Sequence, residues 1–162
     1  MSRIVGAQAV IADPSGRVLL QFRSWPPGWE PPGGHVAPGE DPAQTVVRET
    51  EEECGVRVEI VRRVGLYHFR GIRVGTDAVF LAHPVGGRLK RSREALRVAW
   101  AAPDRLPAAT FPWFRRRIAD ALAFPPEAEV ERWQEVTLAD VARHGLALGR
   151  ELSRAGRGRG GD

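Results

Sequence analysis

One stretch, from Gly33 to Val56 (GGHVAPGEDPAQTVVRETEEECGV), constrains the fold and the chemistry of this chain more than any other. It opens with glycines and a proline, which favour a turn, and continues as an acidic segment with helical spacing. Asp41 suits the N-cap, Pro42 suits the first helical position, and Gln44 completes a capping-box pattern. Gly55 suits the left-handed position that follows a helix. The sequence therefore predicts a helix of about four turns between these signals.

A helical wheel divides this predicted helix into an apolar face and an acidic face. The apolar face is expected to point into the core and consists of Ala43, Val46, Val47, Thr50 and Cys54. Glu49, Glu52 and Glu53 gather on the adjacent arc, and Arg48 lies one turn before Glu52, where an ion pair can form. Three carboxylates on one face repel each other, and a hard cation such as Mg²⁺, which takes oxygen ligands, would relieve the repulsion. Taken alone, the helix leaves a solvated acidic face as an equal alternative.

The loop before the helix separates these alternatives. Gly34 is followed by five residues and Glu40, and then by seven residues and the run RETEEECGV from Arg48 to Val56. This pattern resembles the Nudix box, the loop–helix–loop signature of Nudix hydrolases. Its one soft departure is Thr50, at a position where an aliphatic residue is usual. Seven matched positions with fixed gaps are far more specific than a lone glycine motif.

The resemblance implies an α/β fold of the Nudix type, an α/β/α sandwich with a mixed β-sheet. It also implies hydrolysis of a pyrophosphate bond in a nucleoside diphosphate linked to another moiety, with Mg²⁺ or Mn²⁺ as cofactor and a nucleotide-type small molecule as substrate. Glu49, Glu52 and Glu53 are then the metal ligands, joined by a carbonyl of Gly33 or Gly34. Glu52 is further expected to activate or orient water. Arg48 is expected to hold a box carboxylate in place, with Glu40 bracing the loop.

Two alternative functions remain open beside this one. A Nudix-fold ligand sensor without turnover is disfavoured because a pure binder need not keep all the carboxylates. An RNA-end pyrophosphohydrolase is compatible with the basic loop at residues 86–97. The net charge of +4 and the sequence pI of about 10.4 arise from scattered residues, mostly arginine. Without a nucleic-acid-binding motif, this charge does not predict a nucleic-acid partner.

Length and composition indicate one compact domain in a reducing compartment. The chain has 162 residues, no apolar run that approaches a membrane span, and no basic-then-apolar signal segment at its start. Its single cysteine, Cys54, lies on the predicted apolar face and is expected to be a small buried side chain. We therefore expect a cytoplasmic protein without a membrane partner.

Outside the box, β-strands are predicted at residues 3–12, 17–23, 76–85 and 96–101, and either one bent strand or two short ones at 56–70. The second strand is expected to return along the first after a turn at Asp13–Gly16. Residues 24–32, with four prolines, predict a loop. A helix is predicted at residues 111–124, with an apolar stripe of Phe114, Ile118, Ala121 and Leu122. Its three consecutive arginines, Arg115–Arg117, are expected to lie mainly in solvent.

Four residues near the box are candidates for substrate contacts: Arg23, Trp29, Glu94 and Trp113. Arg23 could bind a phosphate or be an ordinary exposed strand end, and Trp29 could stack on a base, although packing against the domain is favoured. Glu94 lies in the basic loop, which either closes over an anionic substrate near the metal or is simply solvated. Trp113 could line a nucleobase pocket or belong to the core.

The Nudix resemblance covers about residues 1–124, and the remainder is predicted to be an addition to the minimal domain. Pro125 and Pro126 end the preceding helix, and a capping pattern at Thr137 opens another helix that runs to about Arg154. Residues 125–154 are expected to form a helical extension that packs on the domain or on a second copy of the chain, as in a homodimer. Residues 155–162 are too rich in glycine to order themselves and are expected to form a flexible tail.

Overall fold

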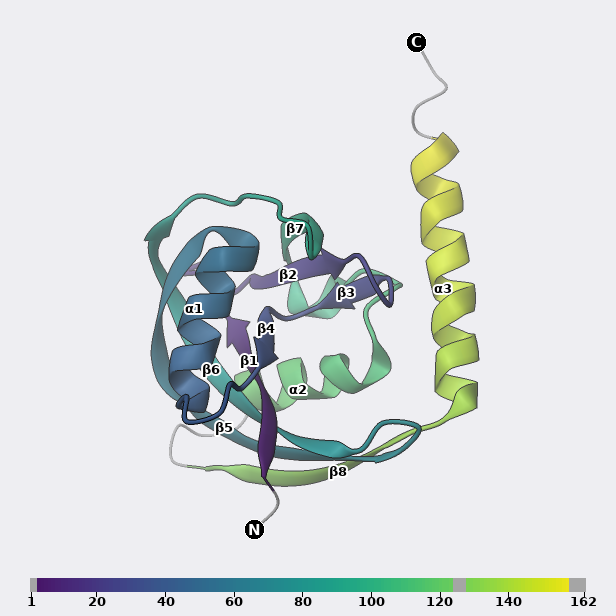
Figure 1. Cartoon of the computed structure of the whole chain (residues 1–162). Coiled ribbons are helices and arrows are strands. Elements are labelled where there is room, and N and C mark those ends of the chain that lie inside the picture. Colours follow the sequence, from purple (N-terminus) through teal and green to yellow (C-terminus); the bar gives the residue numbers. More distant parts are fainter. Residues whose placement is uncertain (1–2, 124–127, 158–162) are drawn as a thin grey trace.

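The structure of the protein is a computed structural model that describes residues 3–123 and 128–157. Strands and helices follow one another along the chain as shown in Figure 1. They are β1 (Ile4–Ile11), β2 (Val18–Arg23), β3 (Gly28–Glu30), β4 (Gly33–His35), α1 (Pro42–Cys54), β5 (Val56–Gly71), β6 (Gly75–Gly87), β7 (Ala95–Ala101), a short 3₁₀ turn (Pro103–Arg105), α2 (Pro112–Ala123), β8 (Val130–Val136) and α3 (Leu138–Arg157).

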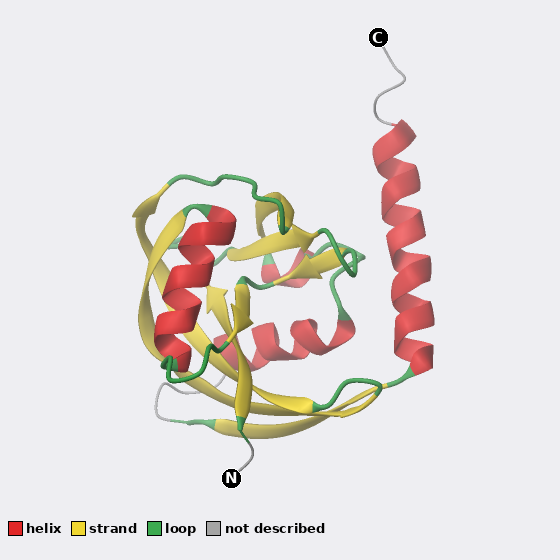
Figure 2. Cartoon of the chain, in the orientation of Figure 1, coloured by secondary structure: helices red, strands yellow, loops and turns green. Residues whose placement is uncertain are grey.

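The strands form two sheets (Figure 2). The larger sheet has the order β4-β1-β6-β5-β8 and is mixed: β1 runs parallel to β6 and β5 parallel to β8, whereas the β1–β4 and β5–β6 pairs are antiparallel. The smaller sheet has the order β3-β2-β7 and is antiparallel throughout.

Each face of the larger sheet carries a separate apolar core, because successive side chains of a strand point to opposite faces. In β1, Ala9 belongs to the core that includes Val46 of α1, whereas its neighbour Val10 belongs to the core that includes Ile118 of α2. The two helices thus cover opposite faces of the sheet (Figure 1). This arrangement confirms the predicted α/β/α sandwich with a mixed sheet.

The local signals of the box set the limits of α1. Asp41 Oδ1 accepts a hydrogen bond from the backbone N–H of Ala43 at 2.7 Å, and Pro42 is the first helical residue. Gly55 ends the helix at φ 75°, in the left-handed region that favours glycine. Val46, Thr50 and Cys54 are fully buried, as predicted for the apolar face.

The predicted pairing of the second strand with the first is wrong. β2 belongs to the smaller sheet, where it pairs with β3 and β7, and a single bridge between Ala12 and Val18 links it to the end of β1. Both faces of β2 are buried, since Leu19 packs into the α1 core and Leu20 into the α2 core. The apolar residues of β2 thus contribute to both cores from the smaller sheet. The predicted loop at 24–32 also contains the short strand β3.

Of the two possibilities at residues 56–70, one long strand is observed. β5 has 16 residues, and its register with β6 shifts at three places: between Arg57 and Val58, between Ile60 and Arg62, and between Arg63 and Gly65. Such irregularities bend a strand and increase its twist.

The predicted apolar stripe of α2 is correct at Phe114, Ile118 and Ala121, which are buried, and wrong at Leu122, which is 41% exposed. A second expectation is also wrong. Arg117 does not lie in solvent but is fully buried, because Asp77 of β6 offers a carboxylate beneath the helix.

The chain after α2 adds a strand as well as a helix. β8 runs parallel to β5 at the edge of the larger sheet, which the expectation of a purely helical extension did not include. Its sequence, VERWQEV, alternates partly buried and exposed positions as an edge strand does, but it has too few apolar residues to give a clear signal. Phe124 and the Pro125–Pro126 break lie outside the described residues, as do residues 158–162 of the predicted tail. Residues 155–157 belong to α3.

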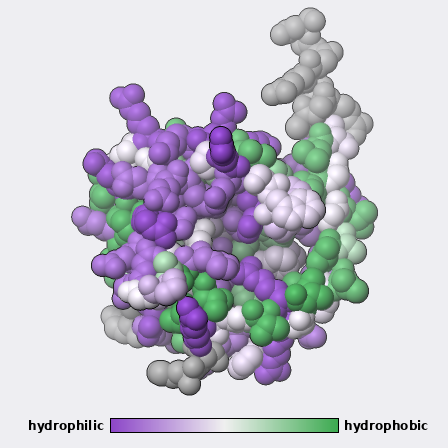
Figure 3. All heavy atoms as spheres, viewed as in Figure 1, coloured by the Kyte–Doolittle hydropathy of each residue, from purple (hydrophilic) through white to green (hydrophobic). Residues whose placement is uncertain are grey.

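One side of α3 contacts the domain and the opposite side is exposed. Leu148 packs against the α2 core, and His144 is buried, with its ring stacked on Phe111 at a centroid distance of 4.0 Å. Hydrophobic side chains are visible along α3 in Figure 3, and its exposed large apolar residues are Leu138, Val141, Leu146 and Leu152. Within residues 3–123 and 128–157, no helix has the combined length and apolar character that a membrane span requires.

Candidate active site

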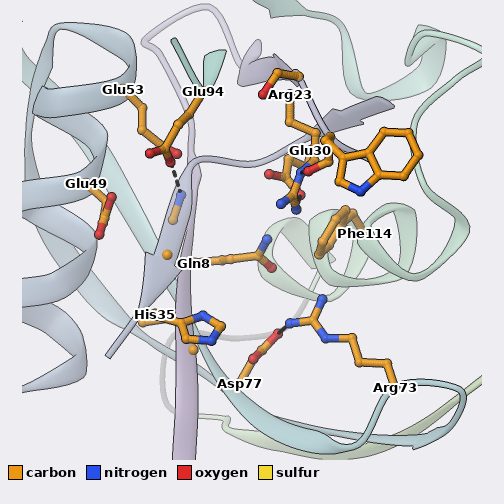
Figure 4. Close-up of a pocket in the computed structure, with 16 residues that line it drawn as sticks. Gln8, Arg23, Glu30, His35, Glu49, Glu53, Arg73, Asp77, Glu94 and Phe114 are labelled. Carbon is orange, nitrogen blue, oxygen red and sulfur yellow. Dashed lines mark hydrogen bonds and ion pairs between the residues drawn. The ribbon is translucent and has the colours of Figure 1, made fainter. Parts of the chain in front are cut away.

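A cavity of about 540 Å³ lies beside α1, between the two sheets (Figure 4). At one end its wall carries four carboxylates, from Glu30, Glu49, Glu53 and Glu94. At the other end it is lined by Gln8 of β1, by Arg73 and Asp77 near the start of β6, and by Phe114 of α2. Strands, α1 and α2 contribute to the same cavity, so only the complete fold assembles it.

Arg48 connects the box helix to the loop that precedes it. Its Nε and Nη2 donate to the two carboxylate oxygens of Glu40 at 3.0 and 3.1 Å, which is bidentate pairing. Its Nη1 donates to Glu49 Oε1 at 2.9 Å and to Glu52 Oε2 at 3.2 Å. These contacts raise the pKa of Arg48 and, through the hydrogen bond from Arg48, hold the pKa of Glu40 at about 2. The guanidinium is thus the counter-charge that the acidic face of α1 requires.

Glu53 is the most deeply placed of the box carboxylates, with 7% of the residue exposed. Its Oε2 accepts hydrogen bonds from Gln21 Nε2 at 2.8 Å and from the backbone N–H of Gly33 at 3.3 Å. Burial nevertheless raises the pKa of Glu53 to about 7, against these hydrogen bonds, and the charges of Glu30 and Glu49 contribute to the rise. Burial in this position therefore disfavours the ionised form of Glu53 unless a cation lies beside it.

Glu30 lines this end of the cavity and Gln21 hydrogen-bonds to its carboxylates, and neither was among the predicted site residues. Gln21 Nε2 also donates to Glu30 Oε1 at 3.4 Å, and Arg23 Nη1 donates to Glu30 Oε2 at 3.1 Å. Burial raises the pKa of Glu30, and Arg23 opposes that rise. The signal in the sequence was a glutamine within the apolar run VLLQF, at a position that is fully buried.

The paired glycines of the box allow the backbone to approach α1 closely. A Cβ atom added to Gly34 would lie 2.7 Å from Glu49 Cδ, nearer than carbon atoms approach without displacement. A Cβ atom on Gly33 would lie 2.2 Å from the carbonyl oxygen of Ala7. Gly33 and Gly34 both line the cavity, so their backbone groups lie beside the Glu49 and Glu53 carboxylates.

The structure brings together only some of the residues that the sequence singled out. Glu49, Glu53, Arg23 and Glu94 line the cavity. Glu52 does not: its side chain is 60% exposed and is paired with Arg48.

Neither tryptophan that was considered for substrate contact lines the cavity. Trp29 is 3% exposed, packs edge-on against Phe22 at 5.4 Å, and donates its indole N–H to Glu151 of α3 at 2.6 Å. Trp113 stacks on Phe111 at 5.0 Å. Trp25, in the same loop as Trp29, does line the cavity and is 79% exposed.

The donors at the carboxylate end fit a hard divalent cation. All are oxygens, from carboxylates and from the nearby backbone, and Mg²⁺ and Mn²⁺ prefer such ligands. Within the described residues, no three His, Cys, Asp or Glu side chains are already close enough together to hold an ion. A cation at Glu49 and Glu53 would favour the ionised form of Glu53, whose pKa is raised first by burial and then by the charges of Glu30 and Glu49.

Comparison with known proteins agrees with this geometry. The NUDIX domain family model matches residues 2–153. A "MutT-like protein" of Streptomyces ambofaciens is 35% identical over 120 residues, covering 73% of this chain and 76% of that protein. A Bacillus subtilis protein, provisionally named 8-oxo-dGTP diphosphatase, is 30% identical over 115 residues, covering 71% of this chain and 77% of that protein.

A solved structure agrees with the fold. The crystal structure of a NUDIX hydrolase from Nitrosomonas europaea aligns with a TM-score of 0.67 and 20% identity, covering 84% of this chain and 82% of that one.

Proposed function

Because the chain belongs to the NUDIX family and is a Nudix hydrolase, we propose that it hydrolyses a pyrophosphate bond in a nucleotide-type substrate with Mg²⁺, or Mn²⁺, as cofactor. One observation carries the proposal: Glu53, buried and with its pKa raised by burial to about 7, faces Glu49 and the Gly33–Gly34 backbone in one cavity. The sequence left open that the acidic face of α1 is simply solvated. In that case the carboxylate of Glu53 would not be buried.

Glu49 and Glu53 are the residues that would hold the cation, together with a backbone carbonyl of Gly33 or Gly34. When bound, a divalent cation neutralises phosphate oxygens and lowers the pKa of coordinated water. Glu52 is exposed and one turn from Arg48, so release of that ion pair leaves its carboxylate free for the metal or for water.

Arginine and glutamine side chains position the carboxylates of the cavity and a phosphate of the substrate. Arg48 holds Glu49 and braces Glu40, which fixes the box loop against α1. Gln21 orients Glu53 through a 2.8 Å hydrogen bond. Arg23 lines the cavity and has a side chain that is 36% exposed, so its guanidinium can contact a phosphate while it remains near Glu30. Glu94, on the same wall, is the acidic residue of the basic loop.

A cavity of about 540 Å³ is large enough for most of a nucleotide. The Bacillus subtilis relative carries the name of an enzyme that acts on an oxidised deoxyguanosine triphosphate, which places nucleoside triphosphates beside nucleoside-diphosphate derivatives in the group of substrates to test.

The test is hydrolysis of a panel that contains both groups of nucleotides and 5′-triphosphate or capped RNA, with Mg²⁺ and with EDTA. We expect the wild-type protein to hydrolyse at least one small nucleotide with Mg²⁺ alone. Glu53→Gln should abolish this activity, whereas Glu51→Gln, on the exposed side of the same helix, should retain it. Retained hydrolysis in a folded Glu53→Gln variant would refute the proposal.

One observation favours a second candidate, a ligand sensor without turnover. The three box carboxylates are not assembled as a metal cluster, because Arg48 already pairs with two of them. Nucleotide binding in a calorimeter without hydrolysis of any member of the panel would select the sensor.

A further inference from the structure

One tryptophan on the wall of the cavity has a large ring that the protein itself does not cover. The ring side chains that line the cavity are those of Trp25, His35 and Phe114. Phe114 is 1% exposed, so a ligand can reach little of its ring. His35 directly follows Gly34, which lies against Glu49 of the box, so its ring belongs to the metal end of the cavity. Trp25 is 79% exposed and stacks on no other ring among the residues that the structure describes.

The backbone at Trp25 is fixed, although its ring is exposed. The backbone N–H of Ser24 donates to the carbonyl oxygen of Glu94 at 3.0 Å, and both residues line the cavity. The carbonyl oxygen of Trp25 accepts from Arg23 Nε at 3.0 Å. A backbone that is already ordered loses little entropy when a ligand binds to it. The ring is therefore held at the cavity wall before any ligand arrives.

α3 holds the other end of the same loop. Nε2 of His144 lies 2.8 Å from the carbonyl oxygen of Pro27, and this nitrogen carries the proton because a carbonyl oxygen only accepts. The ring of His144 stacks on Phe111 at a centroid distance of 4.0 Å. Gly28 makes room for both rings, since a Cβ atom there would lie 2.6 Å from Phe111 Cε2 and 2.7 Å from His144 Nε2. The loop that carries Trp25 is thus fastened to α3.

α3 also fastens the strand that follows this loop. Glu151 accepts hydrogen bonds from Trp29 Nε1 at 2.6 Å and from the backbone N–H of Ala109 at 3.0 Å. The backbone N–H of Trp29 in turn donates to the carbonyl oxygen of Ala109 at 2.8 Å. Glu30, the next residue of β3, lines the cavity. One helix therefore fixes both the loop of Trp25 and the strand beside it.

A nucleotide needs a cation for its phosphates and an apolar surface for its base. Arg23 lines the cavity, and its guanidinium can contact a phosphate. Trp25 lines the same cavity two residues further along the chain. Every base has a π-face that can stack on an aromatic side chain, and removal of such a side chain weakens binding. Arg23 and Trp25 therefore match the phosphate and the base of one nucleotide.

We infer that Trp25 binds the base of the substrate by stacking, and that α3 positions the loop of Trp25 through His144. The inference rests on the proposed function, because it takes the substrate to be a nucleotide. Stacking strengthens the binding of every base and does not select one base by its hydrogen bonds. Trp25 is thus a residue for affinity, shared by all nucleotides that enter the cavity.

The experiment compares adenosine, guanosine and uridine monophosphates with ribose 5-phosphate, which is the same molecule without a base. None of the four has a pyrophosphate bond, so binding can be measured by calorimetry with Mg²⁺ in the absence of turnover. The wild-type protein should bind each nucleotide about 5- to 100-fold more tightly than ribose 5-phosphate, the range expected for one stacked base. Equal binding of the nucleotides and ribose 5-phosphate, or no binding of either, would overturn the inference.

Two substitutions of Trp25 test the ring itself. Trp25→Ala should remove the advantage of the nucleotides and leave the affinity for ribose 5-phosphate unchanged, which also shows that the variant is folded. Trp25→Phe keeps an aromatic face and should retain part of the advantage. Trp133→Ala removes a second exposed tryptophan, one that does not line the cavity, and should leave all affinities unchanged. A folded Trp25→Ala variant that binds nucleotides as the wild-type protein does would refute the role of Trp25.

His144→Phe tests the positioning by α3. Phenylalanine can still stack on Phe111 but cannot donate to Pro27, so only the hydrogen bond to the loop is lost. Nucleotide affinity should fall about 2- to 10-fold, the value of one hydrogen bond, and ribose 5-phosphate should bind as before. For a nucleotide that the protein hydrolyses, KM should rise by a similar factor while kcat changes little, since the base is stacked in both ground and transition state. Unchanged nucleotide affinity in folded His144→Phe would refute the positioning role.

The binding measurement separates this inference from the proposed function. If the advantage of the nucleotides depends on Trp25 in a protein that hydrolyses no nucleotide, the role of Trp25 is supported and the hydrolase proposal is contradicted. Hydrolysis with the same KM in the wild-type protein and in Trp25→Ala would do the reverse.

Discussion

Replacement of Arg117 by methionine is predicted to be among the most destabilising single changes in the protein. Arg117 is fully buried and donates to Asp77 Oδ2 at 2.9 Å, to Gln134 Oε1 at 3.3 Å, and to Gln8 Oε1. Its guanidinium lies about 5 Å from the rings of Tyr67, Phe69 and Phe114, at 5.0, 4.8 and 5.1 Å. Methionine retains most of the volume of the side chain but none of these donors.

The size of the loss in stability follows from the partner that Asp77 keeps in the variant. Loss of Arg117 leaves the buried carboxylate of Asp77 with only Arg73, at 3.5 Å and partly exposed. Removal of one partner of a buried ion pair costs about 3–5 kcal/mol. For a chain of this length, 1 kcal/mol shifts the melting temperature by about 2–4 °C, so we expect a decrease of roughly 6–20 °C. A native free energy of unfolding of about 5–15 kcal/mol exceeds this cost over most of its range, so we expect a variant that is mainly folded at 25 °C.

Urea denaturation of a mutant series measures this cost. Arg116→Met, next to Arg117 but on an exposed side chain paired with Asp120, is the matched control and should cost less than about 1 kcal/mol. The double variant Arg117→Met/Asp77→Leu removes both charges and should recover most of the lost free energy. A cost below about 1 kcal/mol for Arg117→Met would refute the reasoning. A double variant as unstable as the single one would show that lost packing, not the unpaired carboxylate, is the cause.

Three further predictions concern β8, α3 and the box loop. Gly65→Ala would place a Cβ atom 1.9 Å from the carbonyl oxygen of Val130 in β8, so we expect a loss of about 1–3 kcal/mol in the free energy of unfolding. Gly145→Ala, in the middle of α3 with no atom within 4 Å of the added carbon, should instead gain up to about 1 kcal/mol. Glu40→Gln should lower stability at neutral pH. Because Arg48 lowers the pKa of folded Glu40 from 4.5 to about 2, the wild-type advantage should be complete above pH 4.5 and disappear as the pH falls through 2. If the stability advantage of the wild-type protein grew as the pH fell, the ion pair of Glu40 with Arg48 would not be its source.

The features that the sequence predicted correctly are those whose causes lie close together along the chain. Asp41, Pro42 and Gly55 each act within a few residues, and they fixed both ends of α1. The α/β/α sandwich was implied by resemblance to a family with a known fold. Runs of apolar residues predicted β1 and β6, and the alternation of apolar and polar residues predicted β5.

The features that were missed depend on partners far away in the sequence. Arg117 resembles its exposed neighbours until Asp77, 40 residues earlier, is placed beneath it. Gln21 becomes part of the site only through Glu53, 32 residues later. β2 pairs with β7, which lies far along the chain, and no local pattern distinguishes this from a hairpin with β1. The ion pair between Arg48 and Glu52, by contrast, was expected from the sequence, because the two residues lie one turn apart on α1.

Metal binding tests the central claim most directly, since every step proposed for the cavity depends on the carboxylates of Glu49 and Glu53. Calorimetric titration of Mn²⁺ into the wild-type protein, Glu49→Gln/Glu53→Gln and Glu51→Gln, each verified as folded by circular dichroism, measures it without reference to any substrate. We predict one metal site in the wild-type protein and in Glu51→Gln, accompanied by a rise in melting temperature with added metal, and neither effect in the double variant. Equal affinity for Mn²⁺ in all three proteins would contradict the account.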